Sequence, residues 1–289
     1  MFDRDETLEQ ARERNVRDAL AEDIGRCDFT GSLIPHAQRV RARVIVRERA
    51  VVCGQPWFDA CVQQLDPAAA IRWLVDEGAG VAPGQTVCEI EARARALLAG
   101  ERPALNFLQL LSATATAARR YVDAIAGASP NPNGCSILDT RKTLPGLRLA
   151  QKYAVRIGGA NNHRLGLYDG ILIKENHIAA AGGVAAALRA ARALDSGVPI
   201  QIEVETLQQL EQAIGAGATD ILLDNFTLAQ MRQAVAVCAG RARLEGSGGV
   251  DLASVREIAA TGVDRISIGR LTKDIAAVDF SMRVTAGAE

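Results

Sequence analysis

The stretch that decides the fold runs through IQIEVE (200–205), DILLD (220–224), ARLEG (242–246) and RISIG (265–269). Each segment is short and apolar, and residues with helical spacing separate it from the next. This is the alternation of strand and helix in a parallel sheet. The acidic residues at positions 203, 224 and 245 follow one another at intervals of 21 residues. So regular a repeat predicts an α/β barrel, to which SILDT (136–140) and GILIK (170–174) add two earlier strands.

The first third of the chain has a different pattern. Residues 7–24 show helical spacing, and the apolar residues of 40–46 alternate with arginines as in a half-buried strand. Further strands are predicted at 71–75 and 86–91, followed by a long helix over about 102–126. We therefore expect a mixed α+β unit before the barrel, with the arginines of its first strand forming a solvated face. A chain of 289 residues, 48% of them hydrophobic, is large enough for two domains.

Net charge and hydropathy argue against two classes of protein. The formal net charge is −1, so no overall positive field draws the chain onto nucleic acid or an anionic membrane. No apolar stretch is long enough to cross a bilayer, and the start of the chain lacks the apolar core of a signal peptide. The six cysteines lie outside CxxC pairs and metal-ligand spacings, so we interpret them as reduced thiols without a catalytic role. We expect a soluble, cytoplasmic protein.

Positive charge is concentrated between residues 141 and 174, where Asp169 is the only acidic residue. Arg148, Lys152 and Arg156 are spaced four apart, and a solvated basic helix face explains them at least as well as a binding role. The remaining cations lie at strand ends or in the loop GGANNHRLG (158–166), which should face the mouth of a barrel. They are Arg141, Lys142, His163, Arg164 and Lys174. Because arginine binds carboxylates through two parallel hydrogen bonds, this group predicts a ligand with several carboxylates or phosphates.

Small residues follow the strand ARLEG in the segment EGSGGV (245–250), before a helical pattern that starts near Asp251. This arrangement exposes backbone N–H groups at a helix N-terminus, which favours phosphate binding. A glycine-rich turn with a purely steric role is the alternative. Together with SIGRLTK (267–273), the segment matches the phosphate site on the last strands of α/β barrels, and we therefore favour phosphate binding.

Glu203 and Asp224 end two adjacent predicted strands within this cationic mouth. The pair could accept hydrogen bonds from ribose hydroxyls, or bind Mg²⁺ that a pyrophosphate also holds. A structural salt bridge with a lysine or arginine is the alternative, and it explains one carboxylate better than a matched pair. The residues alone therefore describe a barrel that binds a phosphorylated sugar and a polycarboxylate.

Six segments in this half of the chain resemble quinolinate phosphoribosyltransferases. They are DTRKTLPGLR (139–148), KYAVRIGGANNHRLGLYDGILIKENH (152–177), IEVE (202–205), LLDN (222–225), EGSGG (245–249) and ISIGRLTK (266–273). Two earlier segments, AEDIGRCDFT (21–30) and ERPALNFLQLLSATAT (101–116), are similar to the same family, so the resemblance covers nearly the whole chain. One departure is Cys27, where a small residue such as glycine is expected.

The resemblance implies an N-terminal α/β sandwich domain at 1–113 and an open seven-stranded α/β barrel at 114–274, with 275–289 packing against the first domain. It implies a homodimer, or a higher oligomer, in which the sandwich of one subunit covers the barrel mouth of the other. The implied substrates are quinolinate and phosphoribosyl pyrophosphate. Mg²⁺ is implied without an organic cofactor, and no nucleic-acid or membrane partner is expected.

The resemblance also assigns roles to individual residues. Arg141, His163 and Arg164 bind the carboxylates of quinolinate, together with Arg102 of the partner subunit. The expected catalytic residues lie among the charged groups of the substrates, with the two carboxylates facing the ribose hydroxyls and Mg²⁺. They are Lys142, Lys174, Glu203 and Asp224. The remaining expected contacts hold the ribose 5-phosphate and its surroundings, and comprise Thr140, Ser247, Gly248, Gly249, Ile268, Gly269 and Arg270.

The implied reaction joins quinolinate to phosphoribosyl pyrophosphate and decarboxylates the product to nicotinate mononucleotide, a step of de novo NAD biosynthesis. Three alternatives are the related proteins of molybdenum-linked gene sets, a Schiff-base lyase that uses Lys174, and a non-catalytic phosphosugar-binding barrel. The match over 139–177 argues against the first. The second is disfavoured because a Schiff-base lysine should be desolvated, whereas Lys174 lies beside other cations. The third is disfavoured because a binding protein has no need of both a carboxylate pair and a group of cations that binds several carboxylates.

Overall fold

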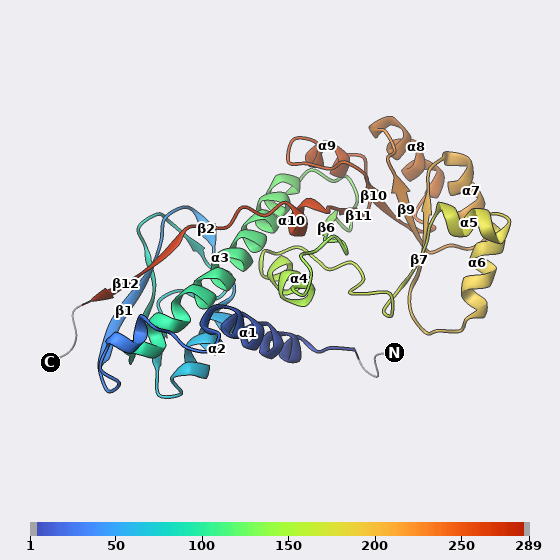
Figure 1. The fold of residues 1–289 in the computed structure, drawn as a ribbon. Coiled ribbons are helices and arrows are strands. Elements are labelled where there is room, and N and C mark those ends of the chain that lie inside the picture. The colour runs from blue at the N-terminus through green and yellow to red at the C-terminus, as the bar shows by residue number, and fades with distance from the viewer. Residues whose placement is uncertain (1–4, 286–289) are drawn as a thin grey trace. The chain divides into compact units, whose positions relative to one another are not determined.

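The computed structural model describes residues 5–285 (Figure 1). Contacts between residues divide the chain into two compact units. The first contains the chain up to Ala117, the segment Leu144–Gly158 and the chain from Asp274 onward, and the second contains Ala118–Thr143 and Gly159–Lys273. The domain boundaries expected from the sequence stay a prediction. They place Leu144–Gly158 in the barrel, whereas its contacts lie in the first unit.

The first unit is built on a four-stranded antiparallel sheet in the order β12-β1-β5-β3. Its strands are β1 (Arg39–Val46), β3 (Ala70–Trp73), β5 (Thr86–Arg93) and β12 (Phe280–Thr285). A separate two-stranded sheet pairs β2 (Ala50–Val51) with β4 (Gly80–Val81). The first residues of β1 alternate as the sequence predicts, because the valines and alanine are buried and the arginines exposed. These arginines form a solvated face, in which Arg41 pairs with Glu91 at 3.0 Å.

Among the described residues, four helices complete the core of the first unit. They are α1 (Leu8–Ile24), α2 (Gln55–Leu65), the first part of α3 (Ala94–Ile125) and α4 (Arg148–Ile157). Trp57 and Phe58 of α2 are almost fully buried, in the same apolar cluster as Ala150 and Ala154 of α4. Burying these alanines is the reason why α4 belongs to the first unit rather than to the barrel.

α4 and α3 each differ in part from their sequence prediction. Lys152 of α4 is only 1% exposed, so the solvated basic face predicted for Arg148, Lys152 and Arg156 is wrong at that residue. α3 begins at Ala94, about two turns before the predicted start near residue 102. Pro103 lies inside α3. Since proline is common in the first turn of a helix, the segment around it looks like a helix start.

The second unit is built on a six-stranded parallel sheet in the order β6-β11-β10-β9-β8-β7. Its strands are β6 (Ser136–Leu138), β7 (Ile171–Ile173), β8 (Ile200–Val204), β9 (Asp220–Asp224), β10 (Arg243–Ser247) and β11 (Arg265–Ser267). Five lie within the segments that the sequence predicts, and β10 extends one residue beyond its segment, to Ser247. The seventh position expected from the resemblance holds a one-residue bridge, in which Asn161 pairs with Leu138. The sheet is thus an open barrel with six full strands.

Helices follow the barrel strands. They are α5 (Glu175–Ala181), α6 (Val184–Ala193), α7 (Leu207–Gly215), α8 (Leu228–Cys238), α9 (Val255–Ala259) and α10 (Arg270–Lys273). Thr206 and Thr227 begin α7 and α8, because each hydroxyl accepts the backbone N–H three residues further on. α9 begins later than the sequence predicts, since Ser254 donates to the Asp251 carboxylate at 2.8 Å in a separate turn. Within residues 5–285, no helix is both long and apolar enough to cross a membrane.

Candidate active site

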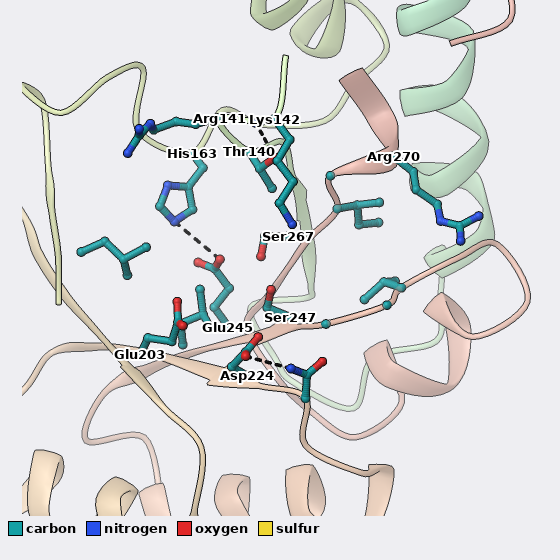
Figure 2. Close-up of a pocket in the computed structure, with 18 of the residues that line it drawn as sticks. Thr140, Arg141, Lys142, His163, Glu203, Asp224, Glu245, Ser247, Ser267 and Arg270 are labelled. Atoms are coloured by element: carbon teal, nitrogen blue, oxygen red, sulfur yellow. Dashed lines mark hydrogen bonds and ion pairs between the residues drawn. The ribbon is translucent and has the colours of Figure 1, made fainter. Parts of the chain in front are cut away.

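A cavity of about 590 Å³ lies at the carboxyl ends of the barrel strands (Figure 2). Except for Arg102, every site residue expected from the sequence lines this cavity. The lining residues that were expected are Thr140, Arg141, Lys142, His163, Arg164, Lys174, Glu203, Asp224, Ser247, Gly248, Gly249, Ile268, Gly269 and Arg270. Strand register explains part of this grouping, because Ser247 lies opposite Asp224 and Leu222 lies opposite Glu203. The cavity has the size of an ordinary small-molecule site.

The cationic wall of the cavity consists of Arg141, His163 and Arg164. Burial lowers the pKa of the Arg164 guanidinium, the positive charge of Arg141 lowers it further, and Asp169 partly opposes both effects. Two neighbouring guanidinium groups in this half-buried wall therefore repel each other. A bound carboxylate would relieve this repulsion and accept paired hydrogen bonds. Arg164 is also held in place, since its Nη1 donates to the Gly170 carbonyl at 3.0 Å.

Lys174 and Glu203 form an ion pair, with 3.1 Å between Nζ and Oε2. The salt bridge that the sequence left open as an alternative is therefore present at Glu203. Burial nevertheless raises the pKa of Glu203; the Lys174 ammonium opposes this rise, and the charges of Asp224 and Glu175 add to it. One lysine does not offset these effects, so Glu203 favours a further positive charge nearby. The Lys174 side chain is 46% exposed, which is unlike the desolvated amine of a Schiff-base enzyme.

The turn after β10 consists of Ser247, Gly248 and Gly249. Gly248 and Gly249 have φ angles of 106° and 58°, in the left-handed region that favours glycine. A Cβ atom on Gly248 would lie 2.1 Å from the Asn225 Oδ1 atom, so a side chain does not fit without movement. Successive backbone N–H groups in such a turn can surround an anion. Because α9 starts only at Val255, the phosphate prediction depends on this turn and not on a helix that follows it directly.

Glu203 and Asp224 are the carboxylates that fit a divalent cation in this cavity. In proteins Mg²⁺ keeps several waters and is commonly held by one or two carboxylates together with substrate phosphates. In the described part of the chain, no three or more His, Cys, Asp or Glu side chains gather into a complete metal site. Burial raises the pKa of Glu203 despite the Lys174 ammonium, and a further positive charge nearby would favour its ionised form. The two residues therefore fit a cation that a phosphorylated substrate also binds.

Some lining residues were missed in the sequence. They are Leu172, Leu222, Asn225, Glu245, Val250, Ser267 and Lys273. Glu245 is the most informative of them, because it is 0% exposed and its Oε1 atom lies 3.6 Å from the Nε2 atom of His163 (Figure 2). The regular interval that links Glu245 to positions 203 and 224 was the signal for it. Arg102 is exposed on α3 in the first unit, and its role in a partner's site stays a prediction.

The fold and the cavity define a class of protein, an α/β-barrel enzyme that binds anionic substrates at the carboxyl ends of its strands. Family models described as the N-terminal and C-terminal domains of quinolinate phosphoribosyl transferase match residues 28–112 and 114–283. The chain belongs to the quinolinate phosphoribosyltransferase family.

Similar proteins share nearly the full length of the chain. It is 39% identical to the probable nicotinate-nucleotide pyrophosphorylase [carboxylating] of Bacillus subtilis, over 93% of this chain and 91% of the relative. It is 38% identical to the nicotinate-nucleotide pyrophosphorylase [carboxylating] of Homo sapiens, over 88% of this chain and 86% of that protein. The solved structure of the nicotinate-nucleotide pyrophosphorylase from Francisella tularensis matches with a TM-score of 0.91 and 42% identity, covering 97% of this chain and 98% of that one.

Proposed function

We propose that this chain is a decarboxylating quinolinate phosphoribosyltransferase of de novo NAD biosynthesis. It would convert quinolinate and phosphoribosyl pyrophosphate into nicotinate mononucleotide, pyrophosphate and CO₂. The observation that carries the proposal is a single cavity that combines a cationic wall, a carboxylate pair and a glycine turn. A dicarboxylate and a phosphorylated sugar together account for all three. The activity for which relatives of similar length are named supports the same reaction.

Binding is the first task of the residues in the cavity. In this proposal, Arg141, His163 and Arg164 hold the two carboxylates of quinolinate, and the turn at Ser247 holds the ribose 5-phosphate. Lys142 and Lys174 offset the remaining negative charge of the substrates. Orienting two reactants in one cavity replaces an encounter in solution, and this effect can lower a barrier by about 7–11 kcal/mol. Positioning therefore supplies a large part of the acceleration.

Charge stabilisation is the second task. As pyrophosphate leaves, the anomeric carbon becomes positively charged, and the carboxylates of Glu203 and Asp224 stabilise this charge. Mg²⁺, when bound by these carboxylates and the pyrophosphate, would neutralise charge on the leaving group. The pyridine nitrogen, held in line by its clamped carboxylates, attacks the anomeric carbon. The positive charge of the ring stabilises the electron pair that remains at C2 when the 2-carboxylate departs as CO₂, and a proton then adds at C2 to give nicotinate mononucleotide. No protein nucleophile is needed.

We further propose a homodimer in which Arg102 of the partner subunit completes each quinolinate site. Arg102 is an exposed cation on a helix outside the barrel, which supports a role beyond its own subunit. We also propose a cytoplasmic location. The six cysteines are all free, and burial raises the pKa of Cys61 and Cys135 to about 12, as befits unreactive thiols in a reducing compartment.

The test is to incubate the protein with quinolinate, phosphoribosyl pyrophosphate and Mg²⁺, and to measure nicotinate mononucleotide and CO₂. We expect both products in equal amounts. Nicotinate in place of quinolinate should react very poorly, because the missing 2-carboxylate removes a counter-charge from the half-buried cationic wall. Equal use of nicotinate, binding without turnover, or a borohydride-trapped adduct on Lys174 would each contradict the proposal and favour one of its alternatives.

A further inference from the structure

A line of hydrogen-bonded side chains, called the relay below, runs from His163 through Gln201 to Glu245 behind the cationic wall. The Nε2 atom of His163 is 2.9 Å from Gln201 Oε1, and Gln201 Nε2 donates to Glu245 Oε2 at 2.8 Å. Arg265 supports the end of the relay, with its Nε atom 3.2 Å from the same Glu245 oxygen. Gln201 is 6% exposed and Glu245 is 0% exposed. A carboxylate buried beside an anion-binding cavity is costly, so its presence calls for a reason.

The Glu245 end of the relay fixes the direction of its hydrogen bonds. A carboxylate paired with a guanidinium only accepts hydrogen bonds, so Gln201 must turn its NH₂ group toward Glu245. The carbonyl oxygen of Gln201 then faces His163, and this oxygen also only accepts. The Nε2 atom of His163 must therefore carry a hydrogen. Glu245 Oε1, which has no hydrogen-bond partner among the described residues, faces the same N–H from 3.6 Å.

The backbone at the other side of the ring leads independently to the same assignment. The backbone N–H of Arg164 points at His163 Nδ1, with 2.7 Å between the nitrogens. A backbone N–H can only donate, so Nδ1 is an acceptor and carries no hydrogen. The chain is held there by Asp139, a buried carboxylate that accepts the backbone N–H of His163 at 2.8 Å. Two fixed groups on opposite sides of the imidazole thus select one tautomer and one ring orientation.

We infer that Gln201 and Glu245 are positioning residues, which hold His163 in its Nε2–H tautomer and keep its ring aligned beside Arg164. Neither residue needs to touch the substrate. With both ring nitrogens engaged, His163 acts on quinolinate through Arg164, whose backbone it holds, rather than by a hydrogen bond of its own to a carboxylate. The inference deepens the proposed function, because it rests on quinolinate binding at the cationic wall. Without the relay, the imidazole would be free to turn about its side-chain bonds, and the cationic wall would lose part of its fixed geometry.

A nuclear magnetic resonance experiment on ¹⁵N-histidine-labelled protein tests the relay without turnover. The chain has three histidines, His36, His163 and His177, so the signal that disappears in His163→Asn is assigned directly. We expect a ring N–H on Nε2 that exchanges slowly with water, since the His163 side chain is 16% exposed and hydrogen-bonded. Gln201→Met should abolish or broaden this signal. Asp220→Asn is the matched control, because Asp220 contacts Arg265 at 2.7 Å in the same cluster but lies outside the relay, and the signal should persist.

Kinetics then link the relay to substrate binding. Gln201→Met should raise KM for quinolinate by about tenfold, the effect of one lost buried hydrogen bond, with KM for phosphoribosyl pyrophosphate and kcat changed far less. Asp220→Asn should show no such selectivity. If Gln201→Met does not fold, Gln201→Asn withdraws the amide by one methylene and is measured in the same way.

Three results would overturn the inference: a hydrogen on Nδ1, an unchanged Nε2–H signal in the Gln201 variant, or an unchanged quinolinate KM in that variant. Failure of the proposed function is a separate result. A wild-type protein that shows the Nε2–H signal yet does not turn over quinolinate would retain the relay and contradict the reaction.

Discussion

At the scale of single residues, Arg141 gives the most direct test of the cationic wall. Arg141→Ala leaves a substrate carboxylate without its partner in a partly dry cavity. We expect kcat/KM for quinolinate to fall by two to three decades or more, the equivalent of about 3–5 kcal/mol. Arg156→Ala is the matched control, because Arg156 belongs to the same basic stretch of sequence but is exposed on α4 in the other unit. Near-normal turnover by Arg141→Ala would contradict the binding of quinolinate carboxylates by the cationic wall.

Glu203 and Asp224 should act on the transition state rather than on quinolinate. Glu203→Gln and Asp224→Asn keep the size of each side chain and remove its charge. Because that charge is needed when the anomeric carbon becomes cationic, we expect kcat to fall by about two decades or more. Calorimetry should show that quinolinate still binds. A collapse of quinolinate affinity with unchanged turnover of bound substrate would assign the carboxylates to the wrong ligand.

Glu203 should also make the folded protein less stable at neutral pH. Burial raises its pKa in the folded state, so ionisation costs more there than in the unfolded chain. This cost is present above the folded pKa and disappears as pH falls below the ordinary glutamate pKa of about 4.3. Glu203→Gln should therefore raise Tm at pH 7 and leave it unchanged in acid. Glu211→Gln, an exposed change on α7, is the control. A lower Tm at pH 7 for Glu203→Gln would show that the ion pair with Lys174 outweighs burial.

At the scale of elements, the turn after β10 predicts separate effects of two adjacent glycines. Gly248→Ala combines a left-handed backbone with a Cβ atom that meets Asn225, whereas a Cβ atom on Gly249 meets nothing within 4 Å. Left-handed backbone costs an alanine about 1–2 kcal/mol at either position. Gly248→Ala should therefore raise KM for phosphoribosyl pyrophosphate well beyond Gly249→Ala, with quinolinate affinity retained in both. Equal effects of the two changes would mean that backbone strain alone is measured.

Sequence patterns predicted the barrel strands well and the connections between them less well. Short runs rich in isoleucine and valine, such as IQIEVE, favour strands because they are too short for a helix, so their position follows from the sequence. The predicted start of α3 was wrong because Pro103 lies inside the helix, whereas proline is more common in a first turn. The predicted start of α9 was wrong because a hydrogen bond between Ser254 and Asp251 closes a separate turn before the helix. The Asn161 bridge was not predictable, since a single pair has no period to detect.

At the scale of the whole molecule, the shared site predicts complementation between two inactive subunits. Arg102→Ala and Arg141→Ala should each be nearly inactive. In a mixed dimer of the two, an Arg102 that acts on its partner places both defects in one site and none in the other. About half of the wild-type activity per mixed dimer should then return. An inactive mixed dimer would mean that Arg102 acts within its own subunit, or not at all.

The grouping of elements into units depends on contacts that no local pattern reveals. The charged ends of the barrel strands were predictable because parallel strands place their carboxyl ends on one edge. Glu245 was not predicted as a site residue, although its regular interval in the sequence was noticed. The role of a buried carboxylate is recognised from its partners, and those of Glu245 come from three other parts of the barrel. The place of α4 in the first unit was not predictable for the same reason. Alanines such as Ala150 and Ala154 occur in any helix, and only their neighbours show which core they join.

The pairing of β12 with β1 has a consequence for synthesis in the cell. The whole barrel lies between these two strands in the chain, so a ribosome releases β1 first and β12 only after every barrel strand has emerged. Until then β1 has an open hydrogen-bonding edge, and such edges promote association between nascent chains. We therefore expect the second unit to fold during translation and the first unit to close last. Chains that are released before residue 280 should therefore depend on chaperones, because β1 lacks its partner strand.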